Sequence, residues 1–246
     1  MQRDRLPFVF VNMAITADGK IATANRVVSS FSSPHDQHQL LLLRAKADAV
    51  MAGARTIDQN AITLGPGPAR YRQLRLKHGL AESNTRIVVS GSGSINPKAE
   101  IFRHRFSPII VLTTERASQA ALKGLNEVAD EVKIFGREAI DFARAFRWLC
   151  EEWQIKRLVC EGGGELNGAL FSAGLVNELN LTICPKVFGG HAAPTIADGE
   201  GALALSRASQ LRLKSMKRVG DELFLVYTVR RQKSKLDSLI QPVFCG

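Results

Sequence analysis

The order of apolar and polar positions divides the chain into strand-like runs separated by stretches with helical spacing. Residues 8–16 form a nearly continuous apolar run with β-branched side chains, which predicts a central strand covered on both faces. The short run 158–160 predicts another buried strand. Apolar runs of similar type predict four further strands, at 47–53, 85–90, 108–113 and 131–135.

Helical spacing separates several of these strands. Ser33 followed by Pro34 is typical of a helix start with the serine as N-cap, and this helix is expected to end near Lys46. Apolar positions predict two further helices, over 118–125 and 139–153. Between them, residues 53–56 are expected to open a short helix. The loop 65–70 holds two prolines and two glycines, so it cannot lie inside an element, and the basic segment after it is helical at best.

The last part of the chain has strand patterns without helices between them. Strands are predicted at 178–184, 212–218 and 222–230, with 219–221 as the turn of a β-hairpin. Strands that alternate with helices and then follow one another predict an α/β protein. Its central sheet is expected to be mainly parallel, with flanking helices and an antiparallel C-terminal edge hairpin. No repeat or linker divides 1–230, which is predicted to be one domain, followed by a polar tail over 231–246.

The stretch RLVCEGGGELNGALF, residues 157–171, joins a predicted strand to a predicted helix through three glycines. This arrangement presents free backbone N–H groups and the positive end of a helix to an anion. Glycine allows positive φ angles and a close approach of a ligand to the backbone. An ordinary strand-to-helix turn uses glycine in the same way, and the spacing differs from the G-x-G-x-x-G fingerprint. The run alone therefore leaves both interpretations open.

Composition narrows the classes of partner. The formal net charge of +10 and pI near 9.8 favour anionic partners. Aromatic residues are only 7% and do not alternate with basic runs, so a nucleic-acid site is not expected. The four cysteines form no C-x-x-C pair and lie far from any histidine cluster, so neither a metal site nor a disulfide framework is expected. No apolar run approaches the roughly 20 residues of a membrane span, which predicts a cytoplasmic protein without a membrane partner.

Six motifs occur in one order along the chain: NMAITADGK at 12–20, LRA at 43–45, ADAVMAGART at 47–56, EGGGEL at 161–166, GLVNEL at 174–179 and CPKVFGG at 184–190. Over residues 8–230 the chain resembles the reductases of riboflavin biosynthesis. These are the reductase half of the bacterial deaminase–reductase and the stand-alone archaeal and fungal reductases. The resemblance implies a dihydrofolate-reductase-like fold, NADPH as cofactor, a homodimer and a phosphorylated pyrimidine as substrate. The H-x-E and P-C-x-x-C zinc signature of the deaminase half is missing, so the chain is expected to reduce and not to deaminate.

The resemblance assigns the cofactor to the turns that follow the predicted strands. The three glycines of the 157–171 stretch, with the N–H groups of the next two residues, would cradle the diphosphate, and in this fold the first two glycines can be joined by a cis bond. Arg55 would help to hold the 2′-phosphate of NADPH, and Thr56 would bind a phosphate. The complete predicted set of cofactor residues is Ala14, Arg55, Thr56, Asn60, Gly91, Gly162, Gly163, Gly164, Glu165 and Leu166.

Three of these positions have equally simple structural explanations. Thr56 fits a plain N-cap, Gly91 a flexible turn and Ala14 a small core residue. Asn60 begins Asn-Ala-Ile, where the family usually has Asp-Asp-Pro or Asp-Asn-Pro. The departures at 28–31, 60–62 and 65–69 all fall on the substrate side of the family's site, so the sequence specifies the cofactor better than the substrate.

On the substrate side, the resemblance points to Arg44, an arginine directly after four leucines that either reaches solvent or is held for an anion. Arg70 would be a second phosphate ligand, with Arg72 less favoured. Glu161 would accept hydrogen bonds from the pyrimidine amino groups and Asn12 would orient the ring.

Asp18, which with Glu161 completes the predicted catalytic pair, either forms a turn or lies near the reacting carbon. The sequence thus predicts an NADPH-dependent reductase that delivers hydride to C1′ of a ring-opened phosphoribosylamino-pyrimidine, giving the ribityl chain. Catalysis would depend on positioning and fixed dipoles, with the proton coming from Asp18 or from water. Whether the pyrimidine is deaminated first stays open. The alternatives are a related reductase of a folate or other pteridine-type substrate, and a non-catalytic nucleotide-binding protein with an acidic partner.

Overall fold

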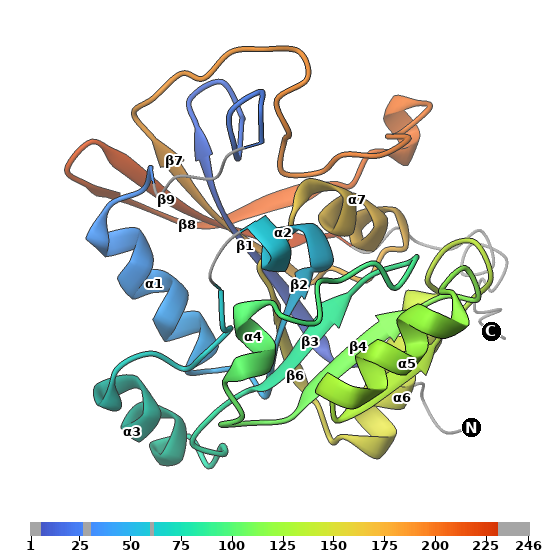
Figure 1. The fold of residues 1–246 in the computed structure, drawn as a ribbon. Helices are drawn as coiled ribbons and strands as arrows, with labels where there is room; N and C mark the ends of the chain where they lie inside the picture. The colour runs from blue at the N-terminus through green and yellow to red at the C-terminus, as the bar shows by residue number, and fades with distance from the viewer. Residues whose placement is uncertain (1–5, 27–30, 60–61, 231–246) are drawn as a thin grey trace, which may run out of the picture.

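The computed structural model describes residues 6–26, 31–59 and 62–230 (Figure 1). The predicted tail 231–246 and the predicted cofactor residue Asn60 lie outside the described residues. Of the four cysteines, Cys150, Cys160 and Cys184 are described, and each is a free thiol. Within the described part of the chain, no helix is long and apolar enough to cross a bilayer.

A nine-stranded sheet forms the centre of the molecule, in the order β5-β4-β3-β2-β6-β1-β7-β9-β8. All neighbours from β5 to β7 are parallel, whereas β9 is antiparallel to both β7 and β8. The predicted mainly parallel sheet with an antiparallel C-terminal edge is therefore confirmed. The strands are β1 Phe8–Thr16, β2 Ala49–Gly53, β3 Thr85–Val89, β4 Ile109–Thr113, β5 Glu131–Ile134, β6 Arg157–Cys160, β7 Glu178–Cys184, β8 Leu211–Val219 and β9 Glu222–Val229.

Helices cover both faces of the sheet (Figure 1). Side chains of α6 and α7 share one buried cluster with Val9 and Val11 of β1. Side chains of α1, α2, α4 and α5 share a second cluster with Phe10. Alternate residues of β1 thus enter opposite cores, as predicted for a doubly covered strand. The helices are α1 Pro34–Arg44, α2 Ala54–Gln59, α3 Ala69–Lys77, α4 Glu100–Arg103, α5 Gln119–Val128, α6 Phe142–Glu152 and α7 Gly164–Ser172, with a 3₁₀ turn at Leu205–Arg207.

Helix boundaries follow the capping side chains. Ser33 is the N-cap of α1 as predicted, because its hydroxyl accepts a hydrogen bond from the His35 N–H at 3.1 Å. The helix predicted from residue 139 begins at Phe142 instead, since the Asp141 carboxylate accepts from the Arg144 N–H at 3.0 Å and so starts the helix there. Helix α4 was not predicted, because four residues are too few to show a helical period.

Candidate functional site

The glycine turn between β6 and α7 has the predicted cis peptide bond, between Gly162 and Gly163. Gly162 adopts φ +77°, and a Cβ built on it would lie 2.7 Å from the sulfur of Met13. A Cβ on Gly163 would have the Thr56 hydroxyl as its nearest neighbour, at 3.7 Å. Gly162 is therefore required by the packing of the protein itself, whereas Gly163 faces open space beside Thr56.

Gly164 differs from both. A Cβ on it would overlap the Asp198 carboxylate and the Thr195 carbonyl, and the Gly164 carbonyl accepts from the Asp198 N–H at 2.9 Å. Gly168, one turn further along α7, would likewise meet the Asp198 backbone. The second half of the glycine motif thus lets the 195–198 loop pack onto α7, a reason that the sequence does not reveal.

A cleft of about 850 Å³ lies beside this turn. Its walls are the turns that follow three parallel strands: Gly53–Thr56 after β2, the 90–94 loop after β3, and Gly163–Leu166 after β6. The carboxyl ends of parallel strands are where open α/β sheets bind ligands. The cleft brings together seven of the predicted cofactor residues: Arg55, Thr56, Gly91, Gly163, Gly164, Glu165 and Leu166.

The other predicted cofactor positions lie differently. Gly162 lies behind the turn, against Met13, and Ala14 is a half-buried residue of β1; neither is among the lining residues of the cleft. At the cleft wall, the Arg55 guanidinium donates to both Glu165 oxygens, at 3.1 and 3.4 Å, with both side chains more than half exposed. This ion pair links the first turns of α2 and α7.

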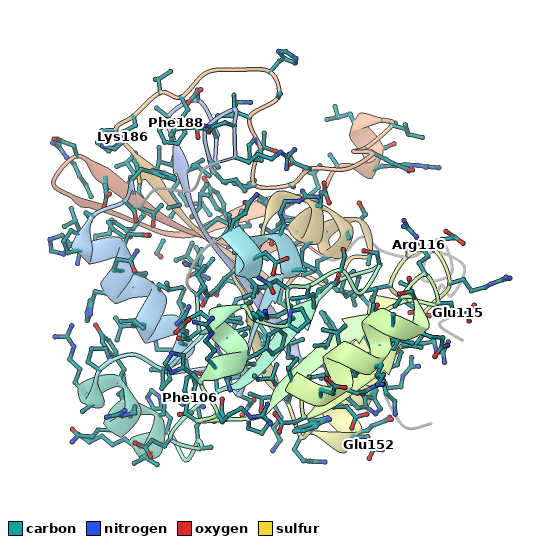
Figure 2. All side chains as sticks on the ribbon, viewed as in Figure 1. Phe106, Glu115, Arg116, Glu152, Lys186 and Phe188 are labelled. Carbon is teal, nitrogen blue, oxygen red and sulfur yellow. The ribbon has the colours of Figure 1, made fainter. Side chains whose placement is uncertain are left out.

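Sequence reasoning missed several lining residues. Arg116 lies on the loop between β4 and α5 (Figure 2), Ile140 lies just before α6, and Phe142 is the first residue of α6. Asp198 and Pro194 belong to the loop that packs on α7. Only Arg116 had a recognisable signal, since it closely follows the predicted strand 108–113 and so had to lie at the same sheet edge as the glycine turn.

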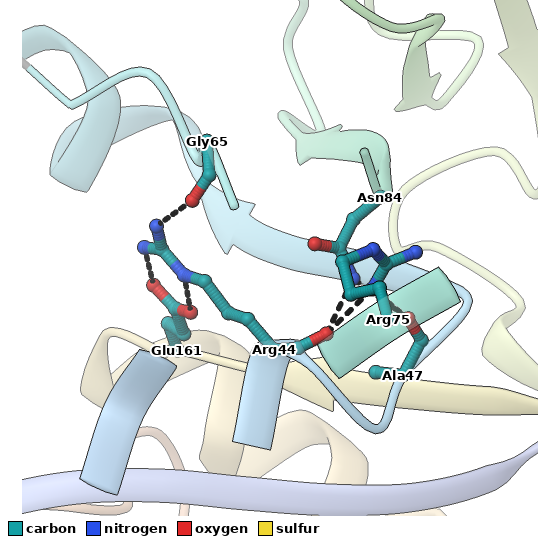
Figure 3. Close-up of polar contacts among 6 residues, drawn as sticks. All are labelled: Arg44, Ala47, Gly65, Arg75, Asn84 and Glu161. Carbon is teal, nitrogen blue, oxygen red and sulfur yellow. Dashed lines mark hydrogen bonds and ion pairs between the residues drawn. The ribbon is translucent and has the colours of Figure 1, made fainter. Parts of the chain in front are cut away.

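The predicted substrate residues Arg44 and Glu161 bind each other (Figure 3). The Arg44 guanidinium donates to both Glu161 oxygens at 2.6 Å, and its remaining terminal nitrogen donates to the Gly65 carbonyl at 2.6 Å. Both side chains are only about a tenth exposed. The pair joins the end of α1, the end of β6 and the loop before α3, so these two predicted substrate ligands already have protein partners.

Two buried side chains hold the backbone of Arg44 in place. Arg75 donates to the carbonyls of Arg44 and Ala47, each at 2.6 Å, and Asn84 donates to the same two carbonyls at 2.9 and 2.7 Å (Figure 3). Burial lowers the pKa of Arg75 to about 10, so its guanidinium stays charged at neutral pH. The direction of Arg44 is therefore set by a network that does not involve any ligand.

Asp18 forms the turn after β1. Its carboxylate accepts from the Thr16 hydroxyl at 2.5 Å and from the N–H groups of Phe188 and Gly189 at 3.2 and 2.7 Å. The hydrogen bond from Thr16, with help from these N–H groups, lowers the pKa of Asp18 from 3.8 to about 2. These three hydrogen bonds fit the turn-forming role, and the catalytic role of Asp18 stays a prediction.

Arg70 lies in a second, smaller cavity of about 300 Å³ at the start of α1, together with His38 and Tyr71. It donates to the Tyr71 hydroxyl at 2.8 Å, and its guanidinium lies 4.7 Å from the ring centre. Arg72 instead pairs with Glu82 at 3.2 Å on an exposed surface. Asn12 is buried in β1. The roles predicted for these residues stay predictions.

Known proteins resemble the chain over most of its length. The sequence profile of the RibD C-terminal domain matches residues 7–225. The chain is 32% identical to the 2,5-diamino-6-ribosylamino-4(3H)-pyrimidinone 5′-phosphate reductase of Methanothermobacter thermautotrophicus, over 91% of this chain and 99% of that protein. It is 31% identical to the reductase of the same name from Archaeoglobus fulgidus, over 87% of this chain and 94% of that protein.

Among solved structures, a pyrimidine reductase-like protein from Corynebacterium diphtheriae superposes with a TM-score of 0.79 at 22% identity, covering 92% of this chain and 93% of that one. The reductase-type neighbours confirm the predicted dihydrofolate-reductase-like α/β fold.

Proposed function

We propose, because the chain belongs to the RibD C-terminal domain family, that it is a reductase of riboflavin biosynthesis. Its substrate is the 2,5-diamino-pyrimidinone 5′-phosphate that names its archaeal relatives, and the ribosyl side chain is reduced to ribityl. One observation carries this proposal: the relative from Methanothermobacter thermautotrophicus aligns over 99% of its length, and the alignment covers 91% of this chain. The cleft at the carboxyl ends of β2, β3 and β6 supports it.

The cofactor in this proposal is NADPH. A cleft of 850 Å³ is of the size that small-molecule and cofactor sites have, roughly 300–1,000 Å³. Gly163 lines it without a side chain, and α7 begins at Gly164 with no side-chain cap, so the N–H groups of its first turn are available to an anion. Thr56 adds a hydroxyl from the start of α2. When bound, NADPH supplies the hydride.

The chain's own residues orient the substrate. Glu161 directly precedes the glycine turn, and its two hydrogen bonds from Arg44 fix the direction of the carboxylate. A fixed dipole of this kind stabilises charge without reorganisation during the reaction. Arg70 lies at the far end of α1, beside His38, and is the proposed ligand of the sugar phosphate. In this proposal water delivers the proton.

A homodimer in the cytoplasm is also part of the proposal. Strand β8 forms the edge of the sheet, and its side chains are exposed from Leu211 to Arg218. Leu213 and Met216 are 51% and 65% exposed. Unpaired edge strands with exposed apolar side chains are suited to pairing with another chain. A second copy covering β8 is therefore the proposed arrangement, which sedimentation of the purified chain tests.

The decisive experiment measures NADPH oxidation by the purified chain with three candidate substrates. We expect turnover with the 2,5-diamino-pyrimidinone phosphate and none with dihydrofolate. Preference for the deaminated uracil counterpart would contradict the substrate, and turnover of dihydrofolate would favour the pteridine alternative. The third outcome is no turnover with any of the substrates, together with nucleic-acid binding that survives 200 mM salt, roughly the range where phosphate contacts weaken strongly. That outcome would favour the non-catalytic binding protein over the reductase.

A further inference from the structure

The strand order arranges several residues that line the cleft in a row along the carboxyl edge of the sheet. Going outward from β6, the neighbours are β2, β3 and β4. Their carboxyl ends carry, in the same order, Gly163, Thr56, the 90–94 loop and Arg116. Three strand spacings separate the first from the last, roughly 14 Å. A dinucleotide whose diphosphate lies at Gly163 and Thr56 and whose adenosine extends toward β3 and β4 would meet the 90–94 loop and Arg116.

Apolar residues also line the cleft near the outer end of this row. Ile140, in the connection between β5 and α6, and Phe142, the first residue of α6, line the cleft, and β5 is the neighbour of β4. They supply apolar surface to the cleft, of the kind that an adenine ring packs against. The same cleft is lined by Ser92 and Ser94, whose hydroxyls lie 2.7 Å apart, and by Arg116.

Arg116 is held next to the serine loop by its neighbours. The buried Thr114 hydroxyl donates to the Gly91 carbonyl at 2.6 Å, and the Arg116 N–H donates to the same hydroxyl at 3.2 Å. On the next residue, the Ala117 Cβ would lie 2.9 Å from a Cβ built on Gly93. These contacts hold the loop after β4 against the loop after β3. The backbone of Arg116 therefore lies in a segment packed against the serine loop.

We propose that Arg116, with Ser92 and Ser94, forms a phosphate subsite for the 2′-phosphate of the cofactor and thereby sets the preference for NADPH over NADH. The inference rests on the NADPH-dependent reduction proposed above and specifies how the cofactor is recognised. A guanidinium with adjacent hydroxyls is a strong phosphate ligand, because charge-assisted hydrogen bonds are directional and short. Arg116 pairs with Glu138 at 3.9 Å, and both side chains are largely exposed, so the guanidinium can turn to a phosphate.

The other two arginines of the cleft lie elsewhere along the row. Arg26 comes from the connection after β1, on the far side of β6. Arg55, to which the family resemblance assigns the 2′-phosphate, lies at the start of α2, and Glu165 accepts from two of its nitrogens. Arg55 thus lies beside the first turn of α7, at the end of the row where the diphosphate is expected. Arg55 is therefore expected to affect NADPH and NADH alike.

The test compares three single variants of the full chain: Arg116→Ala, Arg55→Ala and Arg137→Ala. Arg137 is the matched control, since it is an exposed arginine paired with Glu115 at 3.3 Å and is not among the lining residues. Dissociation constants for NADPH and NADH are measured by fluorescence titration, with 2′,5′-ADP and 5′-ADP as second probes. For Arg116→Ala we expect NADPH and 2′,5′-ADP to weaken at least about tenfold, one charge-assisted contact, with NADH and 5′-ADP within about twofold.

Each other outcome is informative. If Arg55→Ala removes the preference and Arg116→Ala keeps it, the subsite is misplaced although NADPH is the cofactor. Equal loss in Arg116→Ala and Arg137→Ala would mean a general charge effect and would also overturn the assignment. A wild-type chain that binds NADPH and NADH equally, or binds neither, would contradict the proposed cofactor itself. The double variant Ser92→Ala/Ser94→Ala is expected to show the same selectivity with a smaller change.

Discussion

Two arginine–glutamate pairs lie near the glycine turn, and they differ in their burial and in the lengths of their hydrogen bonds. Arg44 and Glu161 are about a tenth exposed and joined by two bonds of 2.6 Å. Arg55 and Glu165 are more than half exposed and joined at 3.1 and 3.4 Å. The first pair is part of the protein's interior and keeps its geometry without a ligand. The second is screened by water, so its members are free to exchange partners when an anion enters the cleft.

Removing one member of the buried pair is expected to have the largest effect. In Glu161→Ala the Arg44 charge remains buried without its counter-ion, which typically costs about 3–5 kcal/mol of unfolding free energy. Chemical denaturation measures this loss. The double variant Arg44→Met/Glu161→Leu should recover most of the stability while remaining inactive. Equal stability of Glu161→Ala and wild type would show that the pair is not held as the structure has it.

Substitutions at Gly163 and Gly164 are expected to affect different properties, cofactor affinity in one case and stability in the other. A side chain in Gly163→Val enters the cleft beside Thr56, so NADPH affinity should fall by about 1–3 kcal/mol, the usual cost of overpacking, while the melting temperature changes little. Gly164→Ala should do the reverse, because its Cβ overlaps Asp198 and Thr195. Calorimetric titration and thermal melting on both variants check this. Loss of binding in Gly164→Ala without loss of stability would contradict the division.

The carboxylate of Asp18 is expected to make the stability of the protein depend on pH. Because its pKa falls from 3.8 to about 2 on folding, Asp18 stabilises the protein above pH 4, and this contribution disappears as the pH falls from about 4 to 2. Asp18→Asn should therefore have a flatter stability curve than wild type in that window. At neutral pH the variant should keep measurable turnover. Complete loss of turnover with a normal fold would make Asp18 catalytic after all.

The exposed pair is expected to give the smallest effect. A double-mutant cycle on Arg55→Ala and Glu165→Ala should yield a coupling free energy below about 1 kcal/mol, falling further in high salt. Denaturation of the four proteins at two salt concentrations measures it. A coupling as large as that of Arg44 with Glu161 would remove the contrast between the two pairs.

Local chemistry made much of the fold predictable. The run 8–16 became β1 with both faces buried, since a nearly continuous apolar strand has no polar face to leave in water. Ser33 and Pro34 marked the start of α1, because capping depends only on neighbouring residues. Helix α6 began later than expected, since a cap at Asp141 outweighs the apolar spacing before it. The cis bond at Gly162 came from the family resemblance and not from the residues alone.

What the sequence alone determined about this protein is the order of its elements, the glycine turn with Thr56 near it, and its family. Tertiary structure alone decided which of these residues meet. Arg44 and Glu161 are 117 positions apart, and only the pairing of β2 with β6 and the end of α1 brings them within 2.6 Å. The contacts of Asp198 with Gly164, and of Thr114 with Gly91, depend on loop packing in the same way. Periodicity and capping record interactions between near neighbours, whereas a site is built from contacts whose partners no local pattern identifies.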